Sequence, residues 1–276
     1  MKIIILVENT TNRPGIEAEH GLSIYMETGG ARILLDAGQK ELFAHNAAAL
    51  GVDLSQVDYA VLSHGHGDHS GGLPLFRSIN PTAPVYMARQ ATRRSYVRRF
   101  GILHFNVGMP RAFASDAGIV GLDADRELSH GAWAVVGIQR QSPYLRSSSN
   151  LYMRKGLWFA QDDFAHELAF VVHEGDSAFV FSSCSHLGLH DIMGALAERG
   201  YLRPRTYVFA GMHLYVALKG TPESPAVLER FAADLLAFPG VTYYAGHCTG
   251  EVAFSYLKSQ MGERLQPMSS GDVFMF

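Results

Sequence analysis

One glycine-rich stretch of the chain carries three histidines and an aspartate within six consecutive positions. Residues 63–73 read S-H-G-H-G-D-H-S-G-G-L, and the side chains that could do chemistry are His64, His66, Asp68 and His69. Neutral imidazole and carboxylate groups are the ligands that suit zinc, manganese and iron. The cluster therefore predicts a metal-binding loop. The alternative is a polar surface loop that is rich in histidine without binding a metal.

The residues around this cluster predict how it is positioned. Residues 57–62 end in an apolar, β-branched run, which is typical of a buried strand. The four glycines of the loop disfavour a regular helix or strand through the polar cluster. Residues two apart on an extended loop point the same way, so His64 and His66 share one side. Asp68 and His69 follow the bend and can face a second point nearby.

The same arrangement, an apolar strand followed by a small-residue loop with a histidine, occurs again later in the chain. The pairs are residues 178–181 with His186, residues 207–210 with His213, and residues 241–245 with His247. These histidines meet the 63–73 loop only if the fold brings distant strand ends together, and that convergence is what we predict. The alternative for His186 is a core histidine whose hydrogen bonds are satisfied locally.

Hydrophobic periodicity predicts a chain of alternating strands and helices. Residues 41–50 have helical spacing, as do residues 226–238, and short apolar runs elsewhere predict strands. The other predicted strands are 3–7, 22–27, 32–35, 84–87, 134–138, 168–172 and an edge strand at 273–276, and further helices start near residue 73 and span 192–199.

Five segments spread along the chain carry a resemblance to a known family. They are A-E-H-G-L-S (18–23), L-S-H-G-H-G-D-H-S-G-G-L (62–73), S-C-S-H-L-G (183–188), A-G-M-H-L (210–214) and A-G-H-C-T-G (245–250). Together they resemble the metallo-β-lactamase superfamily, and most closely its branch of dihydropterin–ribofuranosylaminobenzene-phosphate synthases of methanopterin biosynthesis. The resemblance implies an α/β fold, a four-layer αββα sandwich with a one- or two-metal centre at one edge of its two facing sheets.

The resemblance also implies roles for individual residues. His186 is similar to the third histidine ligand and would complete a site with His64 and His66. His247 is similar to the last ligand and would join Asp68 and His69 at a second metal. Asp36 ends a predicted strand and resembles an aspartate that accepts an N–H from a ligating imidazole and so fixes its tautomer. A simple turn aspartate is the alternative for Asp36.

The strand end at residues 210–214 departs from the superfamily pattern. Many members carry a bridging aspartate there, whereas this chain offers His213. His213 could ligate a metal, contact substrate or donate a proton, and these alternatives stay open. Cys184 and Cys248 lie next to predicted ligands, where thiolate ligation and buried packing are both open and packing is favoured.

Several further residues are candidates for substrate binding. Asn9 and His20 lie in loops beside predicted strands, and Lys219 and Arg94 could contact an anion. On a helix, Arg94 and Arg98 would share a face and form an anion-binding wall. The competing interpretation, which is favoured, is a solvated helix face or a subunit contact, so a homodimer is an open alternative.

Composition limits the class of protein. The 276 residues, 47% of them hydrophobic, predict one domain over residues 1–276. The resemblance implies that residues 87–165 form a variable cap over the site, because substrate choice in the superfamily tends to come from insertions between the ligand segments. A net charge of −3 argues against a nucleic-acid or anionic-membrane partner, and no apolar run approaches the roughly 20 residues that span a bilayer. Two cysteines give no disulfide framework and predict a cytoplasmic protein. His104, His130 and His166 are assigned no chemistry.

The predicted ligand set allows three functions. Two divalent cations, zinc above all but also manganese or iron, would lower the pKa of a shared water and place hydroxide against an electrophile. The first hypothesis is therefore a metal-dependent hydrolase of a small anionic substrate, such as a phosphoester or phosphodiester, with Asp68 and His213 as catalytic candidates. The resemblance implies a second, a transferase that uses a dihydropterin diphosphate. The third is a non-catalytic metal-binding sensor or redox protein.

Overall fold

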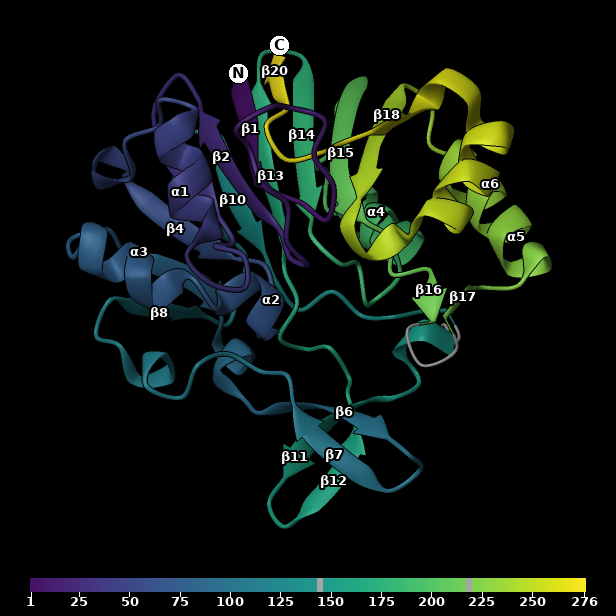
Figure 1. Cartoon of the computed structure of the whole chain (residues 1–276). Coiled ribbons are helices and arrows are strands. Elements are labelled where there is room, and N and C mark those ends of the chain that lie inside the picture. Colours follow the sequence, from purple (N-terminus) through teal and green to yellow (C-terminus); the bar gives the residue numbers. More distant parts are fainter. Residues whose placement is uncertain (143–145, 217–219) are drawn as a thin grey trace.

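The computed structural model describes residues 1–142, 146–216 and 220–276, and two facing seven-stranded sheets form its centre (Figure 1). In the first sheet, β3, β4, β5 and β8 are parallel, while β20, β1 and β2 pair in antiparallel fashion. Its spatial order is β20 (Val273–Met275), β1 (Lys2–Val7), β2 (Ser23–Glu27), β3 (Arg32–Leu35), β4 (Tyr59–Leu62), β5 (Val85–Ala88) and β8 (Ile119–Leu122). The chain therefore ends in an edge strand beside its first strand, as predicted.

The second sheet has the same mixed character. Its strands β14, β15, β18 and β19 are parallel, and β13, β10 and β9 continue the sheet in antiparallel fashion. In spatial order they are β19 (Leu265–Pro267), β18 (Val241–Gly246), β15 (Arg205–Gly211), β14 (Ser177–Ser182), β13 (Ala169–Glu174), β10 (Ala132–Val135) and β9 (Arg126–Ser129).

Helices cover the outer face of each sheet. On the first sheet these are α1 (Leu42–Ala49) and α3 (Leu73–Ile79); on the second they are α4 (Leu189–Glu198), α5 (Pro225–Leu236) and α6 (Glu251–Met261) (Figure 1). The short α2 (Gly67–Ser70) lies in the loop between β4 and α3. The layers follow the order helix, sheet, sheet, helix. The predicted four-layer αββα fold is therefore confirmed.

Three hydrophobic cores hold these layers together, and the strand sequences explain why. Successive side chains of a strand point to opposite faces of its sheet. In β1, Ile3 and Ile5 pack into the core between the two sheets, against Phe181 among others, while Ile4 packs under helix α1 with Phe43. A strand that is buried on both faces has no polar side, which is why these strands read as continuous apolar runs.

The segment predicted to form a cap contributes to more than one layer. Strands β6 (Ser95–Arg99), β7 (Leu103–Asn106), β11 (Leu151–Lys155) and β12 (Trp158–Gln161) form a separate four-stranded sheet that extends from the sandwich (Figure 1). The same segment also supplies β8, β9 and β10 to the two central sheets. The assignment of 87–165 as a substrate cap stays a prediction.

The helical conformation considered for the arginine-rich segment is wrong. Residues Arg89–Thr92 form one turn of 3-10 helix, and Ser95–Arg99 form strand β6. Alternation along the strand places Arg98 and Arg99 on opposite faces, so no helical wall of arginines is present in this segment.

The parallel strands explain how distant residues come to one place. In the second sheet Ser182 pairs with Ala210, which pairs with Ala245, so β14, β15 and β18 end level with one another. In the first sheet β3 and β4 also run parallel and end together. Because the carboxyl ends of parallel strands lie at one edge of a sheet, the loops that follow these five strands meet at one edge of the sandwich.

Candidate metal centre

The structure brings the six predicted ligands together at this edge, and they fall into two neighbouring sets. The first set is His64, His66 and His186, all of which are buried. His64 Nε2 lies 3.1 Å from His66 Nδ1 and 3.3 Å from His186 Nε2. One nitrogen from each ring therefore points to a common position.

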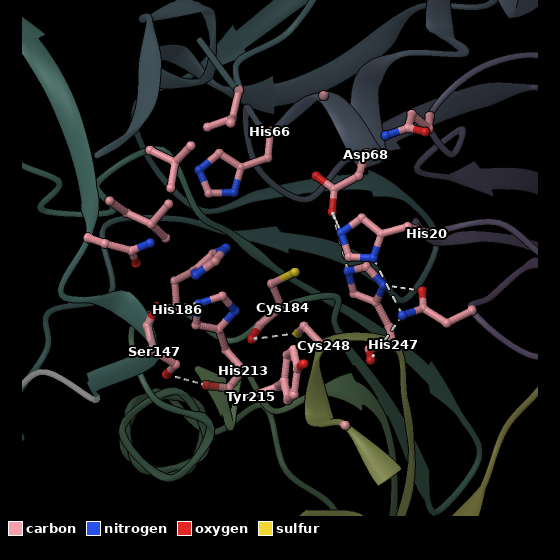
Figure 2. A pocket seen from close by; sticks show the side chains of 18 of the residues that line it. His20, His66, Asp68, Ser147, Cys184, His186, His213, Tyr215, His247 and Cys248 are labelled. Atoms are coloured by element: carbon pink, nitrogen blue, oxygen red, sulfur yellow. Dashed lines mark hydrogen bonds and ion pairs between the residues drawn. The ribbon is translucent and has the colours of Figure 1, made fainter. Parts of the chain in front are cut away.

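The second set is Asp68, His69 and His247. The Nε2 atoms of His69 and His247 lie 3.2 Å apart. Asp68 Oδ2 lies 3.6 Å from His69 Nε2 and 3.5 Å from His247 Nε2. Figure 2 shows Asp68 and His247 on one side of the pocket and His66 and His186 on the other.

Close backbone contacts at Gly71 and Gly72 leave no room for a side chain at the end of the 63–73 loop. A Cβ on Gly71 would lie 2.0 Å from the carbonyl oxygen of Gln39, and one on Gly72 would lie 2.1 Å from that of Ala37. The backbone that follows β3 thus packs directly against the start of α3, which positions the short helix that carries Asp68 and His69.

Asp36 fixes the tautomers of two ligands. Its Oδ2 accepts a hydrogen bond from His69 Nδ1 at 2.8 Å and another from Ser63 Oγ at 2.7 Å. Since the Ser63 hydroxyl donates to Asp36, its oxygen accepts from His64 Nδ1 at 2.9 Å. Both imidazoles therefore hold a proton on Nδ1 and direct Nε2 to the centre, where it can bind a metal once it carries no proton. The structure places Asp36 where the resemblance implied.

His247 is oriented by two polar residues that follow β1. Its Nδ1 donates to Asn9 Oδ1 at 2.9 Å, and its backbone N–H donates to the Glu8 carboxylate. Asn9, predicted to bind substrate, thus holds a ligand in place as well as lining the cavity. Glu8 was not identified from the sequence, although an acid directly after a buried strand was the available signal.

His186 is held by another buried acid that the sequence analysis did not identify. The Glu167 carboxylate accepts hydrogen bonds from the backbone N–H groups of His186 and Leu187, at 2.8 and 2.9 Å. Nearby, His166 Nδ1 accepts from the N–H of Gly65 at 3.2 Å, which ties this segment to the metal loop. The available signal for both residues was their place directly before the apolar run of strand β13.

Burial keeps most of these imidazoles neutral. Burial and the neighbouring imidazoles lower the pKa of His64 and His186 well below the usual range. Burial also lowers the pKa of His66 to about 3 and that of His247 to about 4. For His69, burial alone would lower the pKa, but Asp68 and Asp36 raise it to about 9. Neutral imidazole is the form that binds a metal.

The geometry fits divalent cations. The bare Nε2 lone pairs of His69 and His247 repel each other at 3.2 Å unless a cation or proton lies between them. Two nitrogens bound to one tetrahedral zinc lie about 3.3 Å apart, because each Zn–N bond is about 2.0–2.1 Å. The nitrogen–nitrogen distances of 3.1–3.3 Å in both sets match this spacing.

His213 lies beside the first set. Its ring centroid is 4.2 Å from that of His186, and its Nε2 lies 3.3 Å from the carbonyl oxygen of Ser147. That contact assigns the proton to Nε2, and Nδ1 has no hydrogen-bond partner among the residues that the structure describes. The position leaves open whether His213 contacts a metal or a substrate.

A cavity of about 960 Å³ opens over both sets. His20 lies at its rim, mostly exposed, with Nε2 3.3 Å from Asp68 Oδ2. Arg99 and Arg111 also line it. Arg94, predicted to contact substrate, precedes strand β6 and lines a separate small pocket instead. Lys219 lies outside the described residues.

Comparison with known proteins identifies relatives of this chain. A family model described as "Metallo-beta-lactamase superfamily" matches residues 16–135. The chain is 23% identical to the 7,8-dihydropterin-6-methyl-4-(beta-D-ribofuranosyl)-aminobenzene-5'-phosphate synthase of Methanocaldococcus jannaschii, over 94% of this chain and 90% of that one. It is also 44% identical over 71 residues to an uncharacterized protein of the same organism, a match that spans 26% of this chain and only 27% of that protein.

A solved structure agrees over the whole chain. Tm1679, described as a metal-dependent hydrolase of the beta-lactamase superfamily, superposes with a TM-score of 0.85 and covers 100% of this chain and 99% of its own, at 22% identity. At this identity the likeness shows the fold. Within the described residues, no helix has the length and apolar character needed to cross a membrane. The homodimer, the cytoplasmic location and the excluded partners stay predictions.

The role of Asp36 is testable by metal affinity. Asp36→Asn keeps the size of the side chain but removes the charge that holds the protons of His64 and His69 on Nδ1. We expect the affinity for zinc to fall by about 10–100-fold, measured by competition with a chelator. Ser63→Ala, which disturbs only His64, should have a smaller effect. The exposed Asp123→Asn is the control, and an equal loss in that variant would contradict the assignment.

Proposed function

We propose that this chain, which belongs to the metallo-β-lactamase superfamily, is a metal-dependent hydrolase that acts on a small anionic substrate, a phosphoester or phosphodiester. One observation carries the proposal. Two adjacent sets of imidazole and carboxylate donors lie beside a large cavity that is also lined by arginines. A fold shared with metal-dependent hydrolases supports the same conclusion.

In this proposal the two donor sets hold two divalent cations, with zinc favoured by the number of imidazole ligands. His64, His66 and His186 would hold one ion, and Asp68, His69 and His247 the other. When bound, such ions supply Lewis-acid activation of water and stabilise negative charge that develops on the substrate. The protein contributes rigid positioning, because Asp36, Glu8 and Glu167 hold the ligands from behind.

Asp68 is the candidate for moving a proton. Its Oδ2 lies between the second donor set and His20, whose Nε2 is 3.3 Å away at the cavity rim. A proton accepted by Asp68 can therefore reach solvent through His20. The hydrogen bond to Asp68 outweighs the effect of burial and raises the pKa of His20, which suits a group that holds a proton at neutral pH.

His213 is the candidate for contacting the substrate or its leaving group. Its Nε2–H is held by the carbonyl oxygen of Ser147, so Nδ1 remains to accept a hydrogen bond. The ring also lines the cavity. A substrate hydroxyl or amine could donate to this nitrogen while the anionic group lies nearer the metal ligands.

The cavity wall suggests the charge of the substrate. Arg99 and Arg111 line it, and both come from the 87–165 segment, as do Val97 and Leu151. Arginine binds phosphate oxygens through paired N–H groups. We include in the proposal that this segment selects the substrate, acting as a cap within a single domain.

Turnover of a chromogenic phosphodiester tests the hydrolase. Protein loaded with zinc, manganese or iron should hydrolyse bis(p-nitrophenyl) phosphate, and Asp68→Asn should lower kcat by about 10²-fold or more because a proton carrier is lost. His45→Ala, an exposed histidine on α1, is the control and should keep full activity. Absence of turnover with all three metals at full occupancy would contradict the proposal.

The arginine wall is tested by a KM comparison. Arg99→Gln removes a charge-assisted hydrogen bond of about 1.5–3 kcal/mol, so KM for an anionic substrate should rise about tenfold or more while kcat changes little. Arg94→Gln is matched in chemistry but lies on the separate pocket, and its KM should be unchanged. Equal increases in the two variants would refute a specific role for Arg99.

A second function is favoured by the similarity to the methanopterin-type synthase, which extends over 94% of this chain and supports that branch of the superfamily. In this alternative a dihydropterin diphosphate is coupled to an aminobenzene ribofuranoside phosphate, and pyrophosphate departs. The cavity volume of about 960 Å³ exceeds what a simple phosphoester needs, and Tyr215 in its wall offers a ring for a pterin to stack on.

Pyrophosphate release distinguishes the two functions. Metal-loaded protein given both substrates should release pyrophosphate in equal amount to the coupled product, as measured by a phosphate-detection assay with pyrophosphatase and by mass spectrometry. A transferase requires both substrates, whereas a hydrolase releases product from one alone. If pyrophosphate is released equally without the aminobenzene compound, the transferase is rejected.

A further inference from the structure

We propose that the thiolate of Cys184 bridges the two metal ions, in the place of the carboxylate that β15 lacks at its end. The inference rests on the metal-binding part of the proposed function and specifies its ligands further. Sequence analysis favoured a packing role for this cysteine. The structure directs its sulfur toward the ligands instead.

The position of Cys184 Sγ carries the argument. It lies 3.2 Å from His69 Nε2, a member of the second donor set. It also lies within 4.8 Å of a ring nitrogen of His64 and of His186 from the first set, and of His247 from the second. The sulfur is therefore close to both donor sets, which is the position expected of an atom that binds both ions.

Figure 2 shows the same arrangement. The Cys184 side chain extends between His66 and His186 on one side and Asp68 and His247 on the other. The residue is only 3% exposed, so its thiol faces the ligands and the cavity floor and has little contact with bulk solvent.

Hydrogen bonding also favours a ligand over a packing residue. Asp36 holds one proton of His69 on Nδ1, so Nε2 is the ring nitrogen that faces the sulfur and the centre. In the metal-free protein this nitrogen and the sulfur lie within hydrogen-bond distance of each other. When an ion binds, the thiol proton leaves to solvent, and both the sulfur and Nε2 are free to coordinate it. Sulfur and nitrogen on one tetrahedral zinc lie about 3.6 Å apart, close to the spacing found here.

The residues at the end of β15 explain why a sulfur ligand is needed between the two ions. Two cations held in adjacent sites repel each other, and a shared anionic donor offsets that repulsion. His213, which follows β15, is an imidazole that brings no negative charge and offers one nitrogen. Cys184 follows β14, the strand paired with β15, so its thiolate can supply the missing negative charge from the neighbouring loop.

Cobalt(II) substitution tests the inference without any activity measurement. The wild-type protein titrated with cobalt should bind two ions per chain, with a near-ultraviolet sulfur-to-cobalt charge-transfer band that grows over both equivalents. The electron paramagnetic resonance signal of the doubly loaded protein should be weaker than that of two isolated ions, because a shared sulfur couples their spins.

Variants identify the sulfur. Cys184→Ser and Cys184→Ala should lose the band and the spin coupling and bind the second ion about tenfold or more weakly. Cys248→Ser is the matched control, because it removes the other thiol of the same cluster. This variant should keep both the charge-transfer band and the spin coupling. Circular dichroism and thermal melting establish that each variant is folded. The wild-type spectrum tests the inference even where a variant does not fold.

The other outcomes are also decisive. Three results would each overturn the bridging role while leaving the metal centre intact. The first is two bound cobalt ions without a sulfur band, and the second is a band confined to one equivalent without spin coupling. The third is a band that is lost in Cys248→Ser but kept in Cys184→Ser. Failure to bind cobalt at all would overturn the proposed function together with this inference.

Discussion

The hydrogen bonds of the buried Asp36 carboxylate are the interaction on which the centre depends. One carboxylate oxygen holds His69 directly and His64 through the hydroxyl of Ser63, while the other accepts the Ser63 backbone N–H. These bonds decide which nitrogen of each ring is free, and so they decide that both lone pairs converge. A carboxylate that is fully buried costs solvation free energy, which is offset here by three short hydrogen bonds and by the imidazole protons beside it.

The convergence of so many donors is accompanied by backbone strain. Non-glycine residues with positive φ occur at Asp36, Ser185, His213 and His247, with φ of 56°, 54°, 46° and 50°. Each such residue costs of order 1–3 kcal/mol and persists only where surrounding contacts impose it. All four follow a strand of the two central sheets directly or within a few residues. The fold therefore uses stability from its three apolar cores to turn the chain sharply at the points where ligands must point inward.

The two sheets make different contributions to the same edge. The first sheet delivers Asp36 and the 63–73 loop from adjacent parallel strands, and the second delivers His186, His213 and His247 from three adjacent parallel strands. Neither sheet completes a donor set alone, because each set combines residues from both. Part of the cavity wall comes from elsewhere, from the 87–165 segment with its separate small sheet. The sandwich thus supplies the candidate metal ligands, and the 87–165 segment contributes to the shape and charge of the cavity.

The sequence by itself determined the chemistry of the centre and most of its frame. An apolar strand followed by a glycine-spaced histidine cluster is a local pattern, so the loop at 63–73, the strands before His186 and His247, and the edge strand at the chain end were all predictable. The layered fold followed from the family resemblance that these segments carry, and the structure confirms it.

Only the tertiary structure decided which other polar residues serve the site. Glu8 contacts His247, Glu167 contacts His186, and the Cys184 sulfur lies among the ligands, because sheet pairing brings together segments that are far apart in the chain. Arg99, at the end of strand β6, lines the cavity, whereas Arg94, just before that strand, lines a separate pocket. Such choices depend on register and on close approach between strands, and neither quantity is encoded in the spacing of residues along one stretch of sequence.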